Sequence, residues 1–235
     1  MPETINPALA PASAANAAMP KFAAAMKQLW PHGDAKVPGL VDGIIASAPT
    51  VFAKYGLTSE LVISHAMAQF SEECNAGLEM MENMNYSAPR LLEVFPTHFT
   101  RAMAIAMQHN PRLIADQAYG GRMGNAKPPS DDGWNFRGQG LSQLTGRDNY
   151  AALAKKTGLD LLNHPELIHD PKTALECGVG DFVMCGCLPY ALKDSLVGVS
   201  SMLNVGHFVS DPRKINGFGL RQHWLGLWKH AMGVA

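Results

Sequence analysis

Apolar residues recur at three- and four-residue spacing along most of the chain, which is the repeat expected of helices with one buried face. The segment from Phe22 to Trp30 carries this repeat. Residues 41–56 continue it, with Pro49 either breaking the helix or beginning a new one, and Gly56 as a plausible end. Strand-like alternation is scarce, so the sequence predicts one mainly helical domain.

The strongest helical signal is the stretch LTSELVISHAMAQFSEECNAG, residues 57–77. Thr58 or Ser59 can cap its first turn, which also carries the acidic residue Glu60. Gly77 can end it, because glycine adopts the left-handed backbone that closes many helices. We therefore expect a helix over about 59–76.

Several other segments are helical by period, and one long segment is not. The segment 120–140 is rich in Gly, Pro, Asp and Asn and is predicted to be a long loop, which in a compact domain is usually functional or disordered. Pro96 and Pro111 should punctuate the helical patterns before it. These other helical patterns lie at 88–100, 100–120, 147–158, 171–186 and 221–232.

The first twenty residues, rich in Ala, Pro and Asn with almost no charge, are predicted to be a flexible lead. Residues 21–235 should then form the folded domain. The N-terminus lacks a basic region followed by an apolar stretch, so we do not expect an ordinary secretory signal. The apolar runs fall short of the ~18 residues of a membrane span, so stable membrane insertion is not expected either.

Composition narrows the classes of function. Apolar residues make up 47% and charged residues 17%, a globular balance, and the net charge of −1 gives no reason to expect a nucleic-acid partner. The four cysteines are too few for a disulfide framework, and no histidines fall at metal-ligand spacing near them, so we expect reduced thiols and no metal. These cysteines are Cys74, Cys177, Cys185 and Cys187.

Four glutamates cluster within residues 71–83: Glu72, Glu73, Glu79 and Glu82. Glu73 follows an apolar line along the predicted helix, whereas Glu72 follows a more polar one. Burial on an apolar line would raise the pKa of Glu73 and keep its proton available for general acid catalysis. The alternative is an ordinary helix-end glutamate near solvent.

Glu82 follows Glu73 by nine residues, ~13 Å along the axis if the helix continued. The Asn75-Ala76-Gly77 stop should instead let the chain fold back and bring Glu82 toward Glu73. A carboxyl separation of ~6.5–9.5 Å would suit an inverting glycosidase, and ~5–5.5 Å one that forms a covalent intermediate.

The stretch AQFSEECNAGLEMMENMNYSAPRLLEVFP resembles the catalytic region of glycoside hydrolase family 19, especially its bacterial and phage-endolysin branch. Glu73 and Glu82 match the family's two catalytic glutamates without a gap. Tyr86, within ENMNYSA, matches a substrate-binding position. Glu72 departs from the pattern, because the family usually has His there; a second carboxylate could raise the pKa of Glu73 further or compete for its proton.

A second stretch, DDGWNFRGQGLSQLTGRDNY, resembles the Gly-rich motif of the same family. The resemblance implies that Gln143, Thr145 and Asn149 line the sugar cleft and that Thr145 helps to hold the nucleophilic water. Trp134 falls where an aromatic sugar platform is expected, and Gln139 replaces a usual Arg. Neutral amides, hydroxyls and an indole suit uncharged sugars with acetamido groups.

A third, shorter resemblance leaves two alternatives for a cleft asparagine. Asn204 in SSMLNVGHF keeps the family's spacing from the preceding Val-Gly-Val-Ser. Asn216 in PRKINGFGL keeps the family's local sequence Ile-Asn-Gly. Of the two, Asn204 is preferred. The resemblance spans roughly residues 28–232. It implies a mainly helical, lysozyme-like fold, no cofactor, and inverting hydrolysis of a β-1,4 link beside an N-acetylated sugar.

Three functions follow from this resemblance. The first is a peptidoglycan-cleaving glycosidase, an endolysin or antibacterial cell-wall hydrolase, expected to be a monomer with a polysaccharide as its partner. Made in the cytoplasm, it would act in the periplasm or cell wall after release by a holin or a secretion system. The second is a chitinase. The third is a catalytically impaired sugar-binding protein, suggested by the departures at Glu72 and Gln139.

Overall fold

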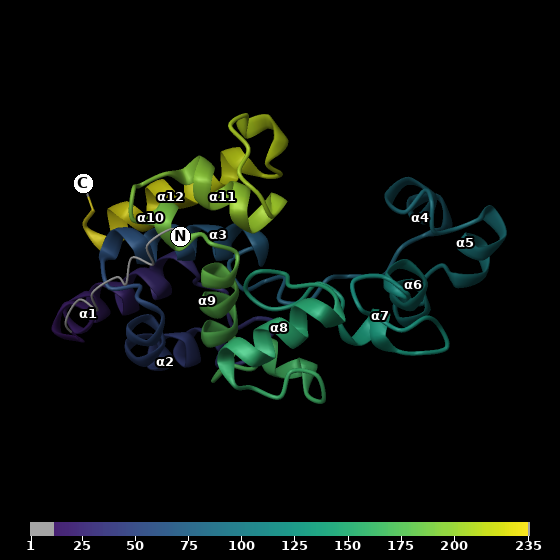
Figure 1. The fold of residues 1–235 in the computed structure, drawn as a ribbon, viewed down its shortest axis with the longest axis horizontal. Coiled ribbons are helices and arrows are strands. Elements are labelled where there is room, and N and C mark those ends of the chain that lie inside the picture. The colour runs from purple at the N-terminus through teal and green to yellow at the C-terminus, as the bar shows by residue number, and fades with distance from the viewer. Residues whose placement is uncertain (1–11, 235) are drawn as a thin grey trace, which may run out of the picture.

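The computed structural model of the protein describes residues 12–234 (Figure 1). The first helix, α1, runs over Ala12–Leu29. Residues 12–20, expected to belong to a flexible lead, are therefore helical, and Ala18 is already fully buried. The rest of that lead, residues 1–11, lies outside the described residues.

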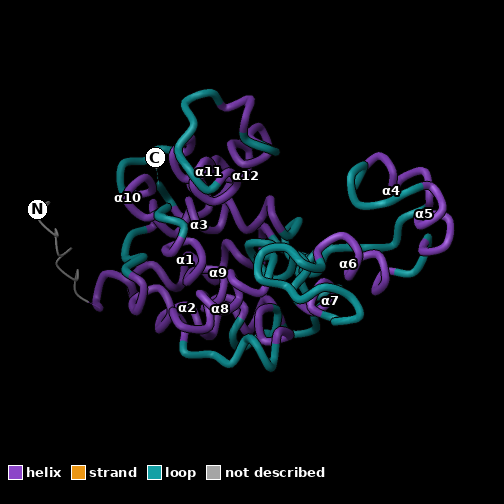
Figure 2. Tube along the Cα trace, turned by 45° about the vertical axis from the view of Figure 1, so that its right-hand side comes forward, coloured by secondary structure: helices purple, strands orange, loops and turns teal. Residues whose placement is uncertain are grey.

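Most helices gather into one large lobe, and a smaller lobe extends from it along the long axis (Figures 1 and 2). The large lobe holds α1, α2 (Leu40–Tyr55), α3 (Glu60–Glu73), α8 (Arg147–Thr157), α9 (Ala174–Met184), α10 (Leu188–Ala191), α11 (Leu196–Val205) and α12 (Phe218–Met232), with 3-10 turns at Pro165–Ile168 and Pro212–Lys214. The small lobe holds α4 (Ala88–Val94), α5 (Arg101–Met107), α6 (Pro111–Tyr119) and α7 (Asp132–Asn135). The prediction of a mainly helical fold is confirmed.

Helix α2 settles the alternatives left open at Pro49. The helix is continuous through this proline, so Pro49 neither breaks it nor begins a second one. Glycines bound the helix at both ends, Gly39 with φ 79° and Gly56 with φ 78°, and the Gly56 N–H bonds back to the last turn. The predicted end at Gly56 is therefore correct, and packing of the helix against α1 and α9 overrides the proline's local preference.

Helix α3 is buried on every side. Its cap is Ser59, one of the two alternatives that the sequence left open, and the Ser59 hydroxyl accepts the Val62 N–H at 3.3 Å. Every residue from Val62 to Ser71 is buried, including the polar ones. The expected contrast between an apolar and a polar line along this helix is therefore wrong, because α1, α9 and α12 enclose both lines.

A buried serine ties three helices together. The Ser71 hydroxyl accepts the indole N–H of Trp30 at 2.9 Å and of Trp228 at 2.8 Å, and donates to the Met67 carbonyl at 2.7 Å. Both indoles are among the largest fully buried side chains of the large lobe. One hydroxyl thus satisfies the polar atoms of two tryptophans that α1 and α12 insert into the core.

The small lobe has its own core, separate from that of the large lobe. Its buried residues are Met84, Ala88, Leu91, Phe99, Ala104, Ile114, Ala115 and Ala118. The lobes meet where the predicted loop 120–140 returns to the large lobe. There, one isolated β-bridge joins Met81 to Gln139 and another joins Gln139 to Leu144. These two bridges are the β structure found within residues 12–234. The large lobe also holds a second cluster of buried apolar residues, around Phe136, Tyr150 and Leu153, so the small-lobe core is one of three among the described residues.

The four cysteines are free thiols, three of them buried and Cys185 partly exposed. Burial raises the pKa of the Cys74 thiol to about 12, so this thiol is unreactive at neutral pH. None of the helices within residues 12–234 has the length and apolar character needed to cross a membrane.

Replacing Ser71 with alanine should destabilise the fold strongly. Ser71→Ala leaves two buried indole N–H groups without an acceptor, at a cost of ~1–3 kcal/mol for each unsatisfied group. We expect a fall of ~2–5 kcal/mol in the free energy of unfolding, measured by urea denaturation. Ser47→Ala is the matched control, because the Ser47 hydroxyl bonds only within its own helix and should cost under ~1 kcal/mol. Equal losses in the two variants would contradict this account.

Candidate active site

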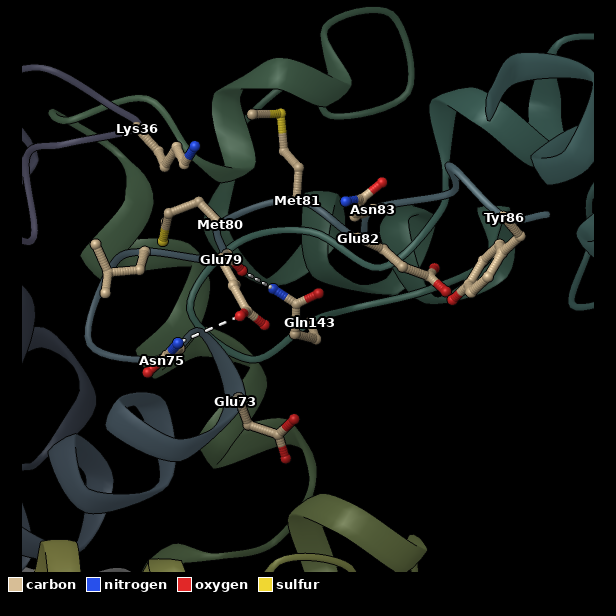
Figure 3. A pocket seen from close by; sticks show the side chains of 11 residues that line it. Lys36, Glu73, Asn75, Glu79, Met80, Met81, Glu82, Asn83, Tyr86 and Gln143 are labelled. Carbon is tan, nitrogen blue, oxygen red and sulfur yellow. Dashed lines mark hydrogen bonds between the residues drawn. The ribbon is translucent and has the colours of Figure 1, made fainter. Parts of the chain in front are cut away.

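A cavity of about 840 Å³ lies beside the end of α3 (Figure 3). We call it the first cavity. It is lined by Glu73 from α3, by residues of the segment that follows that helix, by Gln143 from the Gly-rich motif and by Lys36 from the loop before α2. Glu73 and Glu82 line it together, so the chain does bring the two predicted carboxyl groups to one place.

A sharp reversal after α3 delivers Glu82 to the cavity. Asn75, Ala76 and Gly77 all have left-handed backbones, with φ 47°, 51° and 88°. Gly77 also packs on the loop before α2, where a Cβ would lie 2.8 Å from the Gly33 carbonyl oxygen. The predicted stop thus folds the chain back, and the close approach at residue 77 requires glycine.

Glu73 forms an ion pair with a buried arginine. Arg221 of α12 donates from Nη2 to Glu73 Oε1 at 2.6 Å, from Nη1 to Gln69 Oε1 at 2.7 Å, and from Nε to the Asn216 carbonyl at 3.0 Å. Arg221 is 2% exposed, so this pair is shielded from solvent. The apolar surroundings expected for Glu73 are therefore absent, since a guanidinium faces its carboxyl group.

Sequence reasoning missed Arg221, although the pattern held a signal for it. Arg221, Leu225, Trp228 and Met232 follow one another at helical spacing, and all four are buried. An arginine on an apolar helix face must find a buried partner, because an unpaired buried charge costs several kcal/mol. The partner is the carboxyl group of Glu73.

Glu82 is held by donors from the small lobe and the loop. The Tyr119 hydroxyl donates to both carboxylate oxygens, at 2.8 and 2.9 Å, and the Gly138 N–H reaches Oε2 at 3.4 Å. Burial raises the pKa of Glu82, while the Tyr119 and Gly138 hydrogen bonds and nearby Arg137 act to lower it. Glu82 therefore sits where its charge depends on a few defined contacts.

Gly138 marks the point where the predicted cleft residues converge. A Cβ at this position would lie 3.1 Å from Gln143 Oε1, 3.3 Å from Thr145 Oγ1 and 3.5 Å from Glu82 Oε2. The three side chains thus surround one point, and the absence of a side chain at residue 138 keeps it open. Thr145, expected to help hold a water, lies close to Glu82.

A second cavity of about 520 Å³ continues beyond Gln143, which lines both. Thr145, Asn149 and Asn204 line it, and Asn149 donates to the Thr145 carbonyl at 2.7 Å. Asn216 lies next to Asn204, whose Oδ1 accepts the Asn216 N–H at 2.9 Å. The two alternative asparagines are therefore neighbours, and Asn204 is the one that lines the cavity.

The two aromatic candidates occupy different places. Tyr86 lines the first cavity and packs edge-on against Phe95, with ring centroids 5.8 Å apart. Trp134 lies on α7 and lines neither cavity, and the Arg137 guanidinium covers one ring face at 3.6 Å from its centroid. A sugar platform at Trp134 stays a prediction.

Glu72 points away from the first cavity. Its carboxyl group lies against Gly217, the residue that caps α12, where a Cβ would overlap it. Burial raises the pKa of Glu72, with a smaller increase from Glu73, and Arg221 acts to lower it. Glu72 is therefore a neighbour of the Glu73–Arg221 pair and not part of the cavity wall.

Two solved chitinase structures share the fold of this chain. Chitinase C from Streptomyces griseus matches with a TM-score of 0.54 and 18% identity over 90% of this chain and 76% of that chain. A mutant of chitinase C matches with a TM-score of 0.58 and 16% identity, over 90% of this chain and 92% of that one. At these identities the likeness shows the fold, which is the lysozyme-like helical fold expected.

A sequence relative supports the resemblance to the family. The chain is 35% identical over 125 residues to a glycosyl hydrolase family 19 domain-containing protein of Haemophilus influenzae, over 53% of this chain. The match spans 62% of that relative's length. No family model matches the chain. The resemblance to glycoside hydrolase family 19 is thus confirmed by a homologue and by the fold.

Removing the Tyr119 hydroxyl should shift the pH dependence of any hydrolysis. The bonds from Tyr119 stabilise the charged carboxylate of Glu82, so Tyr119→Phe should raise the pKa of Glu82 further. A base that must be deprotonated then works only at higher pH, and the acid limb of the kcat/KM profile moves upward. Tyr86→Phe is the control, because the Tyr86 hydroxyl makes no hydrogen bond to Glu82. An unmoved acid limb in Tyr119→Phe would exclude Glu82 as the titrating group.

Restoring the usual family residue beside Glu73 should be tolerated. Glu72→His, and the charge-only change Glu72→Gln, should retain activity within about tenfold of the unaltered chain, because this carboxyl group does not line the first cavity. The measurement is a rate at matched protein concentration, with folding checked by circular dichroism. A folded but inactive Glu72→Gln would mean that the carboxyl group of Glu72 takes part directly.

Proposed function

We propose that the protein hydrolyses β-1,4 links beside N-acetylated sugars, with Glu73 as general acid and Glu82 as general base. The observation that carries this proposal is that two carboxyl groups from separate segments line one cavity. Glycosidases of both stereochemical types use such a pair across the scissile bond.

The surroundings of the two carboxyl groups support different roles. Arg221 binds Glu73 Oε1, and within residues 12–234 no hydrogen bond is found to Glu73 Oε2, so this second oxygen is the one available to a substrate. Both oxygens of Glu82 accept hydrogen bonds, from the Tyr119 hydroxyl and the Gly138 N–H, and these bonds orient the carboxylate as a base. Thr145 beside Glu82 supplies a hydroxyl for the attacking water.

The extent of the cleft supports a polymeric substrate. The first and second cavities are neighbours that share Gln143 as a lining residue, which gives room for more than one sugar. Most polar residues of the second cavity, among them Thr145, Asn149 and Asn204, are neutral, and Asp181 is the acidic exception. Amides and hydroxyls suit the hydroxyl and acetamido groups of an N-acetylated glycan.

We propose peptidoglycan as the polymer, with the protein acting as a monomer in the periplasm or cell wall after release from the cytoplasm. The resemblance of the catalytic stretch to the bacterial and endolysin branch of the family supports this choice. Chitin is the second candidate, favoured by the structural relatives, which are named as chitinases. In either case the chain's own residues supply the acid, the base and the sugar contacts.

Glu73→Gln and Glu82→Gln should each abolish hydrolysis without unfolding the protein. General acid–base catalysis is usually worth ~10²–10⁴-fold, and glutamine keeps the shape of glutamate but not its transferable proton. The assays are turbidity loss of permeabilised Gram-negative cells and digestion of chitin oligosaccharides, followed side by side. Glu93→Gln, an exposed residue of the small lobe, is the control and should match the unaltered chain.

The outcomes of these assays separate the three functions. Lysis of cells without chitin digestion supports peptidoglycan, and the reverse result supports a chitinase. Binding of glycans without any hydrolysis would make the protein a sugar-binding member of the fold. Proton NMR of fresh product tests the mechanism, since an inverting reaction on a β-link releases the α-anomer first.

A further inference from the structure

A lysine projects over the first cavity at the side away from Glu73 (Figure 3). Lys36 is the one basic residue among the described residues that line this cavity. It lies in the loop between α1 and α2, far in sequence from the Gly-rich motif and from both glutamates. The proposed acid and base do not use it, so its presence requires another explanation.

The loop that carries Lys36 is held firmly in place. Gly33 packs backbone to backbone on Gly77, and Asp34 Oδ1 accepts the Val41 N–H at 2.8 Å. Val37, beside Lys36, is only 8% exposed and anchors the loop in the core of the large lobe. The backbone under Lys36 is therefore fixed to the same turn that delivers Glu82, while the side chain remains exposed.

The charge of Lys36 is not neutralised within the protein. None of the ion pairs or side-chain hydrogen bonds found among residues 12–234 includes it. The three carboxyl groups of the cavity have other partners. Glu73 binds Arg221, Glu79 accepts the Asn75 amide, and Glu82 accepts the Tyr119 hydroxyl. An ammonium group on a fixed loop is thus left for something that enters the first cavity.

We propose that Lys36 recognises a carboxylate carried by the glycan, and so selects an anionic glycan over a neutral one. This inference rests on the proposed function. Chitin carries no carboxylate. Peptidoglycan carries carboxylates on its stem peptides, or on the lactyl ether of its muramic acid where the peptide has been removed. An ammonium group that meets such a carboxylate forms a charge-assisted hydrogen bond.

Binding measurements test this inference independently of hydrolysis. Three tetrasaccharide probes are titrated by NMR into Glu73→Gln protein: chitotetraose, the GlcNAc–MurNAc tetrasaccharide with free lactyl groups, and the same glycan with stem peptides. Lys36→Gln should weaken binding of the carboxylated probes about three- to fivefold and leave chitotetraose unchanged. The difference should shrink in about 1 M salt, where the screening length falls to about 3 Å.

Two further variants separate recognition from general charge and from folding. Lys27→Gln makes the same change in net charge at an exposed position of α1, outside the cavity. This variant should bind all three probes as tightly as the protein that keeps Lys27. Lys36→Arg keeps the charge and should restore most of the binding. Whichever carboxylated probe loses more affinity in Lys36→Gln identifies the source of the carboxylate.

The possible results distinguish failure of this inference from failure of the proposed function. If Lys36→Gln weakens all three probes equally, or none, Lys36 does not recognise a carboxylate, whatever the protein hydrolyses. If the unaltered active site degrades only chitin while Lys36→Gln still selectively weakens the carboxylated probes, the peptidoglycan function fails and the recognition stands.

Discussion

Helix α3 buries every residue from Val62 to Ser71, so the polar side chains in this stretch need partners within the protein, and this requirement shapes the large lobe. Ser71 meets it by accepting two indole N–H groups, and Gln69 by accepting from Arg221. His65, fully buried, bonds through Nε2 to Asp194 at 2.8 Å, while its Nδ1 has no hydrogen-bond partner among residues 12–234. Because these partners come from α1, α12 and the turn before α11, satisfying one helix sets the arrangement of the others.

The same requirement places the first carboxyl group of the site. Arg221 reaches into the core to satisfy Gln69, and its remaining nitrogen binds Glu73 where α3 emerges at the cavity. The core and the candidate active site therefore share one guanidinium. A change that disturbs the packing of α12 on α3 should also move the carboxyl group of Glu73, which links stability to any catalysis.

The second carboxyl group depends on the junction of the lobes. Glu82 follows the reversal at residues 75–77, its N–H bonds to the Gly138 carbonyl at 2.8 Å, and its carboxylate is held by Tyr119 from α6. The small lobe, with its own core, thus supplies the contacts that position the proposed base. Opening between the lobes would separate Tyr119 from Glu82 and change the charge of that carboxyl group.

Local pattern alone predicted most helices, offered Ser59 as one of two caps for α3 and placed a reversal at residues 75–77, because caps, glycines and apolar spacing act within a few residues of the chain. Helix α3 nevertheless ends at Glu73 rather than near residue 76. The pairing of Glu73 with Glu82 as catalytic residues came from the family resemblance and stays a prediction. The same reasoning failed where distant segments decide. Pro49 sits inside a helix because neighbouring helices hold it there, and α3 is buried on a face that looked polar. Arg221 lies 148 residues from Glu73 along the chain. Tyr119 lies 37 residues from Glu82, and Lys36 lies 46 residues from Glu82. Each completes the surroundings of that glutamate. Only the tertiary structure could bring them there, since partners for buried charge are chosen by packing and not by separation along the chain.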